Sequence, residues 1–448
     1  MTEKIVIGVD VGGTFTDILA FEEKSGRVSV AKTPSTKEDQ SKGFLEGILK
    51  TTNDLSLVST IIHGTTVATN ALLERKGAKT GIITTRGFRD VLEMRRRDRP
   101  KTWGLWGTFT PVVERKNRLE VSERTLADGT IRSPIDEKEI ENCAKTLLEN
   151  GCSSVCLFFI NGYANPENER RAAKVLRSVW PNKHVSVATE ILPEIREFER
   201  CSTATLNAYL QPPVANYLER LETRISEERK KSEILIVQSN GGVMSVETAK
   251  SLPIRTALSG PAAGVVAARQ IAKAAGFENI ITGDMGGTSF DISLIANNQN
   301  MLTSQANIDF GMTIRTPMIE MTTIGAGGGS IAHIDSTGLL EIGPESAGSD
   351  PGPACYGFGN DRPTVTDANL VLGRIDASNP IGGKQKSLDY DAATRAVDNH
   401  IAKKLNLSIH DAAEAIIKVA NAKMSGAIRL ISIERGYDPK KFALMPFG

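Results

Sequence analysis

Short apolar runs bounded by turn residues alternate with longer segments of helical periodicity along most of the chain. In the first half, apolar runs of strand length occupy residues 5–12, 16–22, 28–34, 61–66, 80–85, 153–160 and 184–190. Segments with a repeat of about 3.6 residues lie between them and predict helices at 37–50, 67–76, 136–150 and 166–179. An order of three strands, a helix, a strand and a helix is typical of a mixed α/β domain.

A second series of elements follows a charged helical stretch at about 200–230. Its predicted elements are an opening strand at 233–237, a helix at 261–275, further strands to about 343 and a long amphipathic helix at 409–433. Residues 86–135 and 343–363 are rich in Gly and Pro, the first also in Arg and Trp, and predict irregular structure. We therefore expect two related mixed α/β domains, residues 1–192 and 193–448, with a cleft between them.

A glycine turn with an aspartate on each side occurs twice, once in each predicted domain. The two copies are Asp10-Val-Gly-Gly-Thr-Phe-Thr-Asp17 and Asp284-Met-Gly-Gly-Thr-Ser-Phe-Asp291, and an apolar run precedes and follows each. A lone Gly-Gly turn after a strand is usually only a hairpin, but such a turn also exposes backbone N–H groups that bind phosphate oxygens. Two matched copies, each with an acid before the turn that can hold magnesium or orient a water, indicate phosphate binding.

Composition excludes several other classes of protein. The chain has 448 residues, of which 40% are hydrophobic and 24% charged, so more than one domain of a globular protein is expected. Its net charge of +1 gives no signature of nucleic-acid binding. No apolar run approaches the roughly 20 residues that cross a bilayer, and no signal-peptide pattern is present, so the cytoplasm is the expected location. Five cysteines without ligand spacing predict neither a disulfide framework nor a zinc site.

The paired Asp-x-Gly-Gly-Thr hairpins resemble the ATPase superfamily of actin, sugar kinases and heat-shock chaperones. Within it, the chain resembles the hydantoinase A / 5-oxoprolinase family along its whole length. The segments that carry the resemblance are residues 8–17, 63–77, 87–92, 259–264, 283–288, 347–357 and 364–369. The resemblance implies an α/β fold of two related, mixed-sheet, ribonuclease-H-like domains with an interdomain cleft. Family members continue past Gly448, so we expect the second domain to be incomplete and cut before the turn that holds adenosine.

The resemblance also implies the cofactors ATP and Mg²⁺ and the residues that hold them. The turns at Gly12, Gly13 and Thr14 and at Gly286, Gly287 and Thr288 are expected to cradle the β- and γ-phosphates. Asp10 and Asp284 are expected to be catalytic and to face each other at the magnesium ion and its waters. This machinery holds a γ-phosphoryl group in line with an oxygen nucleophile.

Family chemistry leaves three functions open. The leading prediction is hydrolytic ring opening of a cyclic amide such as a hydantoin, 5-oxoproline or a lactam, in which ATP phosphorylates the amide oxygen and water opens the ring. A subunit of a ketone carboxylase, which activates bicarbonate or an enolised ketone, is the alternative enzyme. A conformational ATPase of the actin or chaperone type is the third. For the enzymes, a B-type hydantoinase subunit is the expected partner, within an oligomer and without nucleic acid or membrane.

Four residues in or just after the strand at 61–66 are candidates for substrate contact, namely His63, Thr65, Thr66 and Asn70. Small polar residues at a strand end often line a cleft, but the same threonines can cap the helix that follows. His63 is either a general base or a packed, hydrogen-bonded histidine.

Further candidates carry a structural alternative beside the functional one. Asp17 and Asp291 are interpreted as structural carboxylates of the hairpins. The run at 325–330 is a lid, a third anion-binding nest or a plain turn. Cys355 is more readily a buried thiol than a nucleophile, because no histidine motif accompanies it. Asp367 is a cleft candidate without an assigned role.

Overall fold

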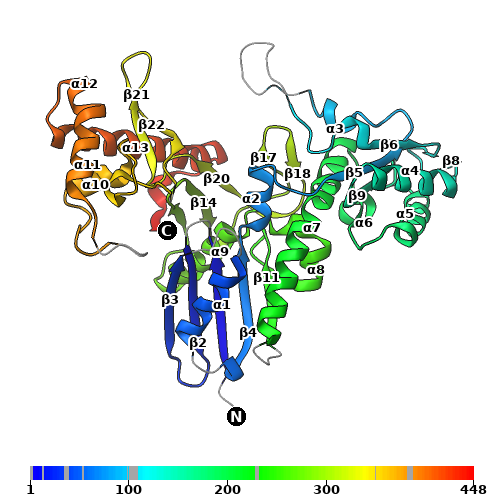
Figure 1. Cartoon of the computed structure of the whole chain (residues 1–448), viewed down its shortest axis with the longest axis horizontal. Coiled ribbons are helices and arrows are strands. Elements are labelled where there is room, and N and C mark those ends of the chain that lie inside the picture. Colours follow the sequence, from blue (N-terminus) through cyan, green and yellow to red (C-terminus); the bar gives the residue numbers. More distant parts are fainter. Residues whose placement is uncertain are drawn as a thin grey trace.

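A computed structural model describes residues 4–12, 15–34, 40–52, 55–97, 99, 109–227, 232–348, 350–380 and 387–448. Within these ranges the chain forms an N-terminal unit built on a six-stranded sheet, a smaller lobe built on a four-stranded sheet, and a second unit built on a five-stranded sheet (Figure 1). No helix among the described residues is long and apolar enough to cross a membrane.

The six-stranded sheet has the order β12-β11-β4-β1-β2-β3. Its strands are β1 (Ile5–Val11), β2 (Phe15–Glu22), β3 (Val28–Pro34), β4 (Val58–Thr65), β11 (Glu233–Val237) and β12 (Val243–Ser245). The first three strands form an antiparallel meander, and β4 runs parallel to β1 on its other side. The three N-terminal strands are those predicted from the apolar runs.

Buried and more exposed residues alternate along β1, so its side chains divide between two faces of the sheet. Ile5, Ile7 and Val9 are buried in one core with Phe44 and Ile48 of α1 (Gln40–Thr51) and with the long helix α7 (Glu197–Glu227). Because successive side chains of a strand point to opposite faces, Asp10 lies on the face of β1 that is turned away from this core.

A smaller lobe inserts between β4 and β11. Its sheet has the order β10-β9-β5-β6 and is parallel throughout. The strands are β5 (Thr80–Thr85), β6 (Arg118–Val121), β9 (Ser154–Phe158) and β10 (Val185–Val187), and the helices are α3 (Val91–Met94), α4 (Glu137–Glu149), α5 (Glu167–Val179) and α6 (Ala188–Ile191). The prediction that residues 86–135 are irregular is therefore wrong in part, since α3, β6 and the hairpin β7 (Arg124–Thr125)–β8 (Ile131–Ser133) lie there.

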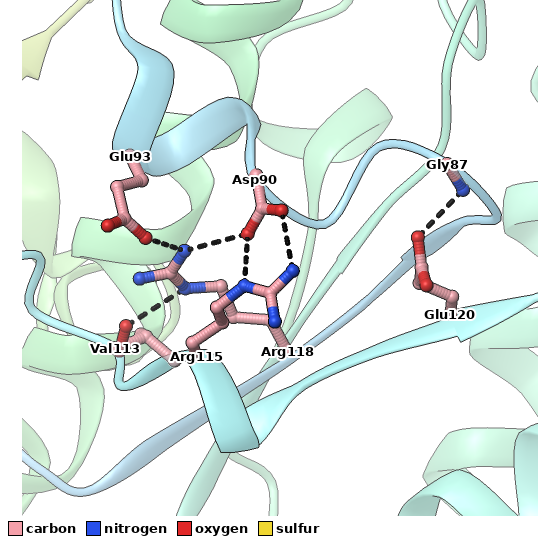
Figure 2. A network of polar contacts seen from close by, with 7 residues as sticks. All are labelled: Gly87, Asp90, Glu93, Val113, Arg115, Arg118 and Glu120. Atoms are coloured by element: carbon pink, nitrogen blue, oxygen red, sulfur yellow. Dashed lines mark hydrogen bonds and ion pairs between the residues drawn. The ribbon is translucent and has the colours of Figure 1, made fainter.

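Ion pairs hold together the described part of this arginine-rich segment. Figure 2 shows the carboxylate of Asp90 accepting two hydrogen bonds of 2.9 Å from Arg115, while Arg118 donates to Glu93 and to the carbonyl of Val113. The hydrogen bonds from Arg115 lower the pKa of Asp90 below its ordinary value. Arg118 is fully buried, so these partners are needed to compensate its loss of water. The contacts attach the loop before α3 to the start of β6.

The second unit repeats the plan of the first. In its sheet, β13 (Ile280–Met285) and β14 (Phe290–Ala296) form a hairpin, and β23 (Ala443–Phe447) runs parallel to β13 on its other side. The further strands β15 (Gln299–Asn300) and β20 (Met321–Ile324) both pair with β14. Helix α9 (Ser259–Ala274) packs in one core with β13 and β14 residues, and α13 (Ile409–Ser432) packs in another. The strands β1, β2 and β4 have the same arrangement, an antiparallel hairpin with a parallel strand beside it.

The remaining elements complete the two units. They are α2 (Val67–Leu73), α8 (Val246–Ser251), β16 (Leu302–Thr303), β17 (Ala306–Asp309), β18 (Met312–Ile314), β19 (Met318–Ile319), β21 (Ser330–Ile334), β22 (Leu340–Ser346), α10 (Val365–Val371), α11 (Tyr390–Val397) and α12 (Lys403–Leu405). The β17–β18 hairpin buries Met312 and Ile314 in the core of the N-terminal unit, which ties the two units together.

The interpretation that residues 233–237 open the second unit is wrong. This segment is β11, which pairs in parallel with β4 of the first sheet, and β12 pairs with β11. The first sheet is therefore completed by two strands, β11 and β12, that follow the small lobe and α7 in the sequence. A division of the chain at 192/193 remains a prediction.

Candidate active site

Each glycine hairpin places its two aspartates directly opposite each other. Asp10 of β1 pairs in register with Asp17 of β2, and Asp284 of β13 pairs with Asp291 of β14. Directly opposed residues of an antiparallel pair project from the same face of the sheet. We refer to these four side chains as the hairpin carboxylates.

Glycines leave room for one carboxylate of each pair. A Cβ atom at Gly64 of β4 would lie 2.9 Å from Oδ1 of Asp10, and one at Gly260 would lie 3.3 Å from the same atom. A Cβ atom at Gly448 would lie 2.6 Å from Oδ1 of Asp284. The carboxylate of Asp10 is therefore held between the backbones of β4 and of the first turn of α9.

Helix α9 joins the first hairpin to the second sheet. Its start is fixed to the N-terminal unit, because Leu258 N donates to Oγ1 of Thr69 at 2.9 Å and Ser259 Oγ donates to the carbonyl of Thr65 at 3.0 Å. Its buried residues pack against Ile280 and Ile295 of the second sheet. The body of one helix thus supports β13 and β14 while its first turn contacts Asp10.

The turn of the second hairpin is open to solvent and held from behind. Gly286, Gly287 and Thr288 are exposed, and Gly286 N donates to Ser289 O at 3.0 Å to close the turn. Within the described part of the chain, the N–H groups of Gly287 and Thr288 have no hydrogen-bond acceptor. In the first hairpin, Gly12 is half-buried, and Gly13 and Thr14 lie outside the described residues.

The glycine run at 325–330 supports this turn. Gly328 N donates to Gly286 O at 3.0 Å and Gly329 N donates to Gly287 O at 2.6 Å. Gly327 N donates to the hydroxyl of Ser330 at 2.9 Å. Because these three N–H groups already have acceptors inside the protein, the run is not a third anion-binding nest. It is a turn whose backbone is docked on the second hairpin.

The two aspartates that precede the glycine turns have raised pKa values. Burial, together with the charge of Asp17, raises the pKa of Asp10 to about 6 although Lys32 opposes the rise. Burial, the charge of Asp291 and that of Asp10 raise the pKa of Asp284 to about 6. Asp10 is exposed to solvent, although surrounding protein atoms desolvate its carboxylate. Asp10 and Asp284 therefore lie within electrostatic range of each other, one from each unit.

The partners of the second acid differ between the hairpins. Lys32 Nζ of β3 forms an ion pair of 3.1 Å with Asp17, whereas Asp291 accepts hydrogen bonds from Thr323 at 2.5 Å and Ser289 at 3.2 Å. Burial raises the pKa of Asp291, and the two hydroxyls oppose this. No group of three or more His, Cys, Asp or Glu among the described residues is arranged to hold a metal ion alone. Mg²⁺, however, is commonly bound by one or two carboxylates together with substrate phosphates, and Asp10 and Asp284 fit that role.

His63 lies beneath the first hairpin rather than at its surface. It is completely buried, with Nδ1 3.3 Å from the carbonyl of Val9 and Nε2 2.8 Å from the hydroxyl of Tyr217. A carbonyl only accepts, so Nδ1 carries the proton and Nε2 accepts from Tyr217. Burial lowers the pKa of His63 to about 4. This is the geometry of the packed histidine, and the structure does not bring His63 to the turn residues.

Thr65, Thr66 and Asn70 lie at the β4–α2 junction beside the first hairpin. The Thr66 hydroxyl donates to Val11 O at 3.2 Å and accepts from Asn70 Nδ2 at 3.2 Å. Thr65 is buried, and its hydroxyl accepts from Val67 N at 3.2 Å. Thr65 therefore satisfies a donor at the start of α2, while Thr66 and Asn70 fix the end of β1 just before the glycine turn.

Cys355 and Asp367 are structural. Asp367 is buried and accepts from Ala354 N, Cys355 N and Thr364 N, and it forms a capping box with Thr364 at the start of α10. Burial and the neighbouring Asp367 raise the pKa of the Cys355 thiol well above its ordinary value, which disfavours the thiolate. Neither residue is a cleft residue.

Sequence patterns do not identify Lys32, Gly64 or Gly260 as site residues. A signal for Lys32 exists in the meander, since short turns between β1, β2 and β3 fix a register that sets Lys32 opposite Asp17. No comparable signal exists for Gly64 and Gly260, because their approach to Asp10 depends on how β4 and α9 pack against β1.

Family models match almost the whole chain. The model described as Hydantoinase/oxoprolinase matches residues 200–448, and the model described as Hydantoinase/oxoprolinase N-terminal region matches residues 6–180.

Individual relatives agree with this match. The chain is 38% identical to the caprolactamase subunit alpha of Pseudomonas jessenii and 31% identical to 5-oxoprolinase 1 of Arabidopsis thaliana, covering 99% of this chain and 65% and 38% of those proteins. The crystal structure of the ATP-dependent caprolactamase superposes with a TM-score of 0.86 at 37% identity, over 99% of this chain and 65% of that one. The nucleotide-free acetone carboxylase structure superposes with a TM-score of 0.84 at 27% identity, over 100% and 65%.

These superpositions confirm the predicted fold of two actin-like, mixed α/β domains. The chain spans less than two thirds of the length of each of these relatives. Other relatives are also named as subunits, among them the acetophenone carboxylase gamma subunit of Aromatoleum aromaticum, at 32% identity over 99% of this chain and 63% of that protein.

Proposed function

Because the chain belongs to the hydantoinase/oxoprolinase family, we propose that it supplies the ATP-binding part of an enzyme that opens a cyclic amide by hydrolysis. The observation that carries this proposal is the position of Asp10 and Asp284. They come from equivalent hairpins of the two units and lie within electrostatic range of each other. Such an arrangement suits a phosphate chain held between two turns with a metal ion beside it.

Backbone N–H groups and carboxylates of the chain have different parts in binding the nucleotide. The N–H groups of Gly287 and Thr288 point to no protein acceptor within the described residues and are available to phosphate oxygens. By the internal repeat, we assign the same phosphate-binding role to the sequence Gly12-Gly13-Thr14 of the first unit. Asp10 and Asp284 would hold Mg²⁺ together with the phosphates. The support of 325–330 behind the second turn keeps the N–H groups of that turn in position.

ATP would supply the phosphoryl group that activates the amide carbonyl, so that water can add to its carbon. The C–N bond then breaks with the ring nitrogen leaving as the amine, and hydrolysis releases the phosphoryl group as inorganic phosphate. For this step the protein must orient the substrate oxygen in line with the phosphate and exclude competing water. Thr66 and Asn70 contribute by fixing Val11 at the end of β1, immediately before the first turn. The buried His63 supports the same strand from below and does not act as the base.

The cyclic amide is favoured over the ketone by the relatives. Identity is 38% with the caprolactamase subunit and 32% with the acetophenone carboxylase subunit, although both match almost the whole chain. Because such relatives are named as subunits, we further propose that a B-type hydantoinase polypeptide completes the enzyme.

The test is strict coupling of ATP hydrolysis to one substrate. The protein, together with its partner subunit, is assayed for ADP release with caprolactam, 5-oxoproline, hydantoin, or acetophenone plus bicarbonate. Turnover coupled to a cyclic amide is expected. Coupling to the ketone would identify a carboxylase instead, and ADP release independent of every substrate would identify a conformational ATPase.

Matched variants test whether the hairpins carry this activity. Asp10→Asn and Asp284→Asn are each expected to abolish coupled turnover while circular dichroism stays unchanged. Asp391→Asn, an exposed position of α11, is the control and should retain full turnover. Normal turnover in both hairpin variants would show that the hairpins are only structural.

A further inference from the structure

Lys32 lies in one row with the carboxylates of the first hairpin. Asp10, Asp17 and Lys32 occupy directly paired positions on the adjacent antiparallel strands β1, β2 and β3, so their side chains share one face of the sheet. The Nζ atom of Lys32 lies 3.1 Å from Oδ1 and 3.3 Å from Oδ2 of Asp17. Its charge also reaches Asp10, whose pKa it lowers against the larger effect of burial.

The second hairpin has the same two acids but no counterpart of this lysine. Thr323 of β20 occupies the position paired with Asp291. Among the described residues, no lysine or arginine is ion-paired with Asp284 or Asp291. Among the described residues, the two hairpins therefore share the same pair of acids, but only the first has a lysine paired with them.

A polyphosphate brought between four carboxylates meets strong repulsion. A magnesium ion offsets part of this repulsion. A cationic side chain of the protein that can move toward the ligand offsets the rest. The side chain of Lys32 is 41% exposed, and its ammonium group carries three donors on a flexible stem. Asp10 lies at the end of β1 that leads into the glycine turn, and Asp17 and Lys32 are beside it in the same row. A phosphate group held by that turn would therefore lie near Lys32.

We propose that Lys32 binds the terminal phosphate of the nucleotide, exchanging its ion pair with Asp17 for one with the phosphate, and so distinguishes a triphosphate from a diphosphate. This inference rests on the proposed function. Asp17 is then the resting partner that holds Lys32 in place when no nucleotide is bound. Thr323 gives the second hairpin no such discrimination.

Equilibrium binding tests the exchange without any turnover. Affinities for the magnesium complexes of a non-hydrolysable ATP analogue and of ADP are measured by calorimetry on the complete polypeptide. Lys32→Met is expected to weaken binding of the triphosphate by about tenfold or more, the usual effect of losing one charge-assisted hydrogen bond, and to leave ADP within about twofold. Lys32→Arg should restore most of the difference, and Lys24→Met, at an exposed position in the β2–β3 turn, should change neither affinity.

Asp17→Asn separates ligand binding from a purely structural ion pair. If Lys32 leaves Asp17 for the phosphate, Asp17→Asn tightens triphosphate binding or leaves it unchanged. Equal losses in Asp17→Asn and Lys32→Met, or equal losses of ATP analogue and ADP in Lys32→Met, would overturn the role of Lys32 alone. No magnesium-dependent binding of either nucleotide to the unaltered protein would overturn the proposed function together with this inference.

Discussion

The negative charge of Asp10 acts on Asp284 although the two residues belong to separate sheets. Burial and the charge of Asp291 raise the pKa of Asp284 to about 6, and the charge of Asp10 raises it further. In the absence of a cation between them, both acids bind protons more tightly than in an unfolded chain. The site is therefore destabilised by its own ionisation near neutral pH, which is a common property of sites that bind cations or phosphate.

Replacement of Asp284 by Asn should stabilise the protein without ligand. The folded-state pKa of about 6 exceeds the ordinary value of 3.8, so the folded state holds more protons between these values. The stability contributed by this group is complete below about pH 4 and is lost as the pH rises through 6. Allowing for partial solvent exposure, Asp284→Asn should raise the free energy of unfolding by about 1 kcal/mol at pH 8 and by little at pH 4.

Urea unfolding at the two pH values measures this effect, with Asp391→Asn as the control. Saturating Mg²⁺-ATP should narrow the gap between Asp284→Asn and the unaltered protein at pH 8, because the ligand stabilises only the protein that binds it. An equal gain at both pH values would show that the ionisation of Asp284 is not the cause.

His63 should influence stability with the opposite dependence on pH. Its folded-state pKa of about 4 lies below the ordinary value of 6.5, so the unfolded state binds the proton first. The stability that depends on neutral His63 is complete above pH 6.5 and is lost as the pH falls through 4. Tyr217→Phe removes the donor to Nε2 and should lower the free energy of unfolding by roughly 1–2 kcal/mol.

Nucleotide affinity in Tyr217→Phe distinguishes a packed histidine from a functional one. If His63 only supports β1, the variant binds Mg²⁺-ATP as the unaltered protein does and shows the same profile of turnover against pH. A shifted pH profile with unchanged stability would instead make His63 a proton carrier.

Local sequence patterns predict elements whose contacts lie within one segment of the chain. They do not predict pairing with a segment that is distant in sequence. The meander β1–β3 and helix α13 follow from alternation and from helical periodicity within single segments. Residues 233–237 have the correct strand pattern, yet nothing in that pattern states that the partner is β4, whose pairing segment lies far earlier in the chain. In the described part of segment 86–135, ion pairs join side chains that are distant in sequence, and a periodic pattern cannot predict such pairs.

The candidate site divides in the same way. Asp10 and Asp284 can be predicted because the hairpin motif occurs twice, and comparison of the two copies shows which residues they share. Gly64 and Gly260 have no such repeat, and their importance is steric and depends on the docking of β4 and α9. The run at 325–330 is conspicuous in sequence, but its role as a support of the second turn depends on hydrogen bonds to Gly286 and Gly287.

Gly327→Ala tests that support. A Cβ atom at this position would lie 2.6 Å from Thr288 N and 2.7 Å from Gly286 O, both of which are backbone atoms of the second turn. Because backbone cannot rotate away as a side chain can, the turn must move. The free energy of unfolding should fall by about 1–3 kcal/mol, and Mg²⁺-ATP affinity should fall with it.

Chemical denaturation and calorimetry measure the two effects of Gly327→Ala. Gly426→Ala is a suitable control, since no atom lies within 4 Å of a Cβ there and alanine is favoured in the interior of α13. It should leave nucleotide binding unchanged and slightly stabilise the protein. Full stability of Gly327→Ala would mean that the run and the turn separate readily, which would restore the lid interpretation.

Gly64→Ala tests the position of the Asp10 carboxylate. The added Cβ atom would lie 2.9 Å from Oδ1 of Asp10 and 3.8 Å from Cα of Gly260, so the carboxylate must turn away while the backbone has room to stay. Mg²⁺-ATP affinity should fall by about tenfold, whereas the free energy of unfolding should change by less than about 1 kcal/mol. Gly8→Ala on the neighbouring strand β1, where the nearest atom is the Leu19 carbonyl at 4.0 Å, is the matched control and should affect neither quantity strongly. Unchanged affinity in Gly64→Ala would show that the orientation of Asp10 does not matter to the ligand, and Asp10 would then lose its place at the metal ion.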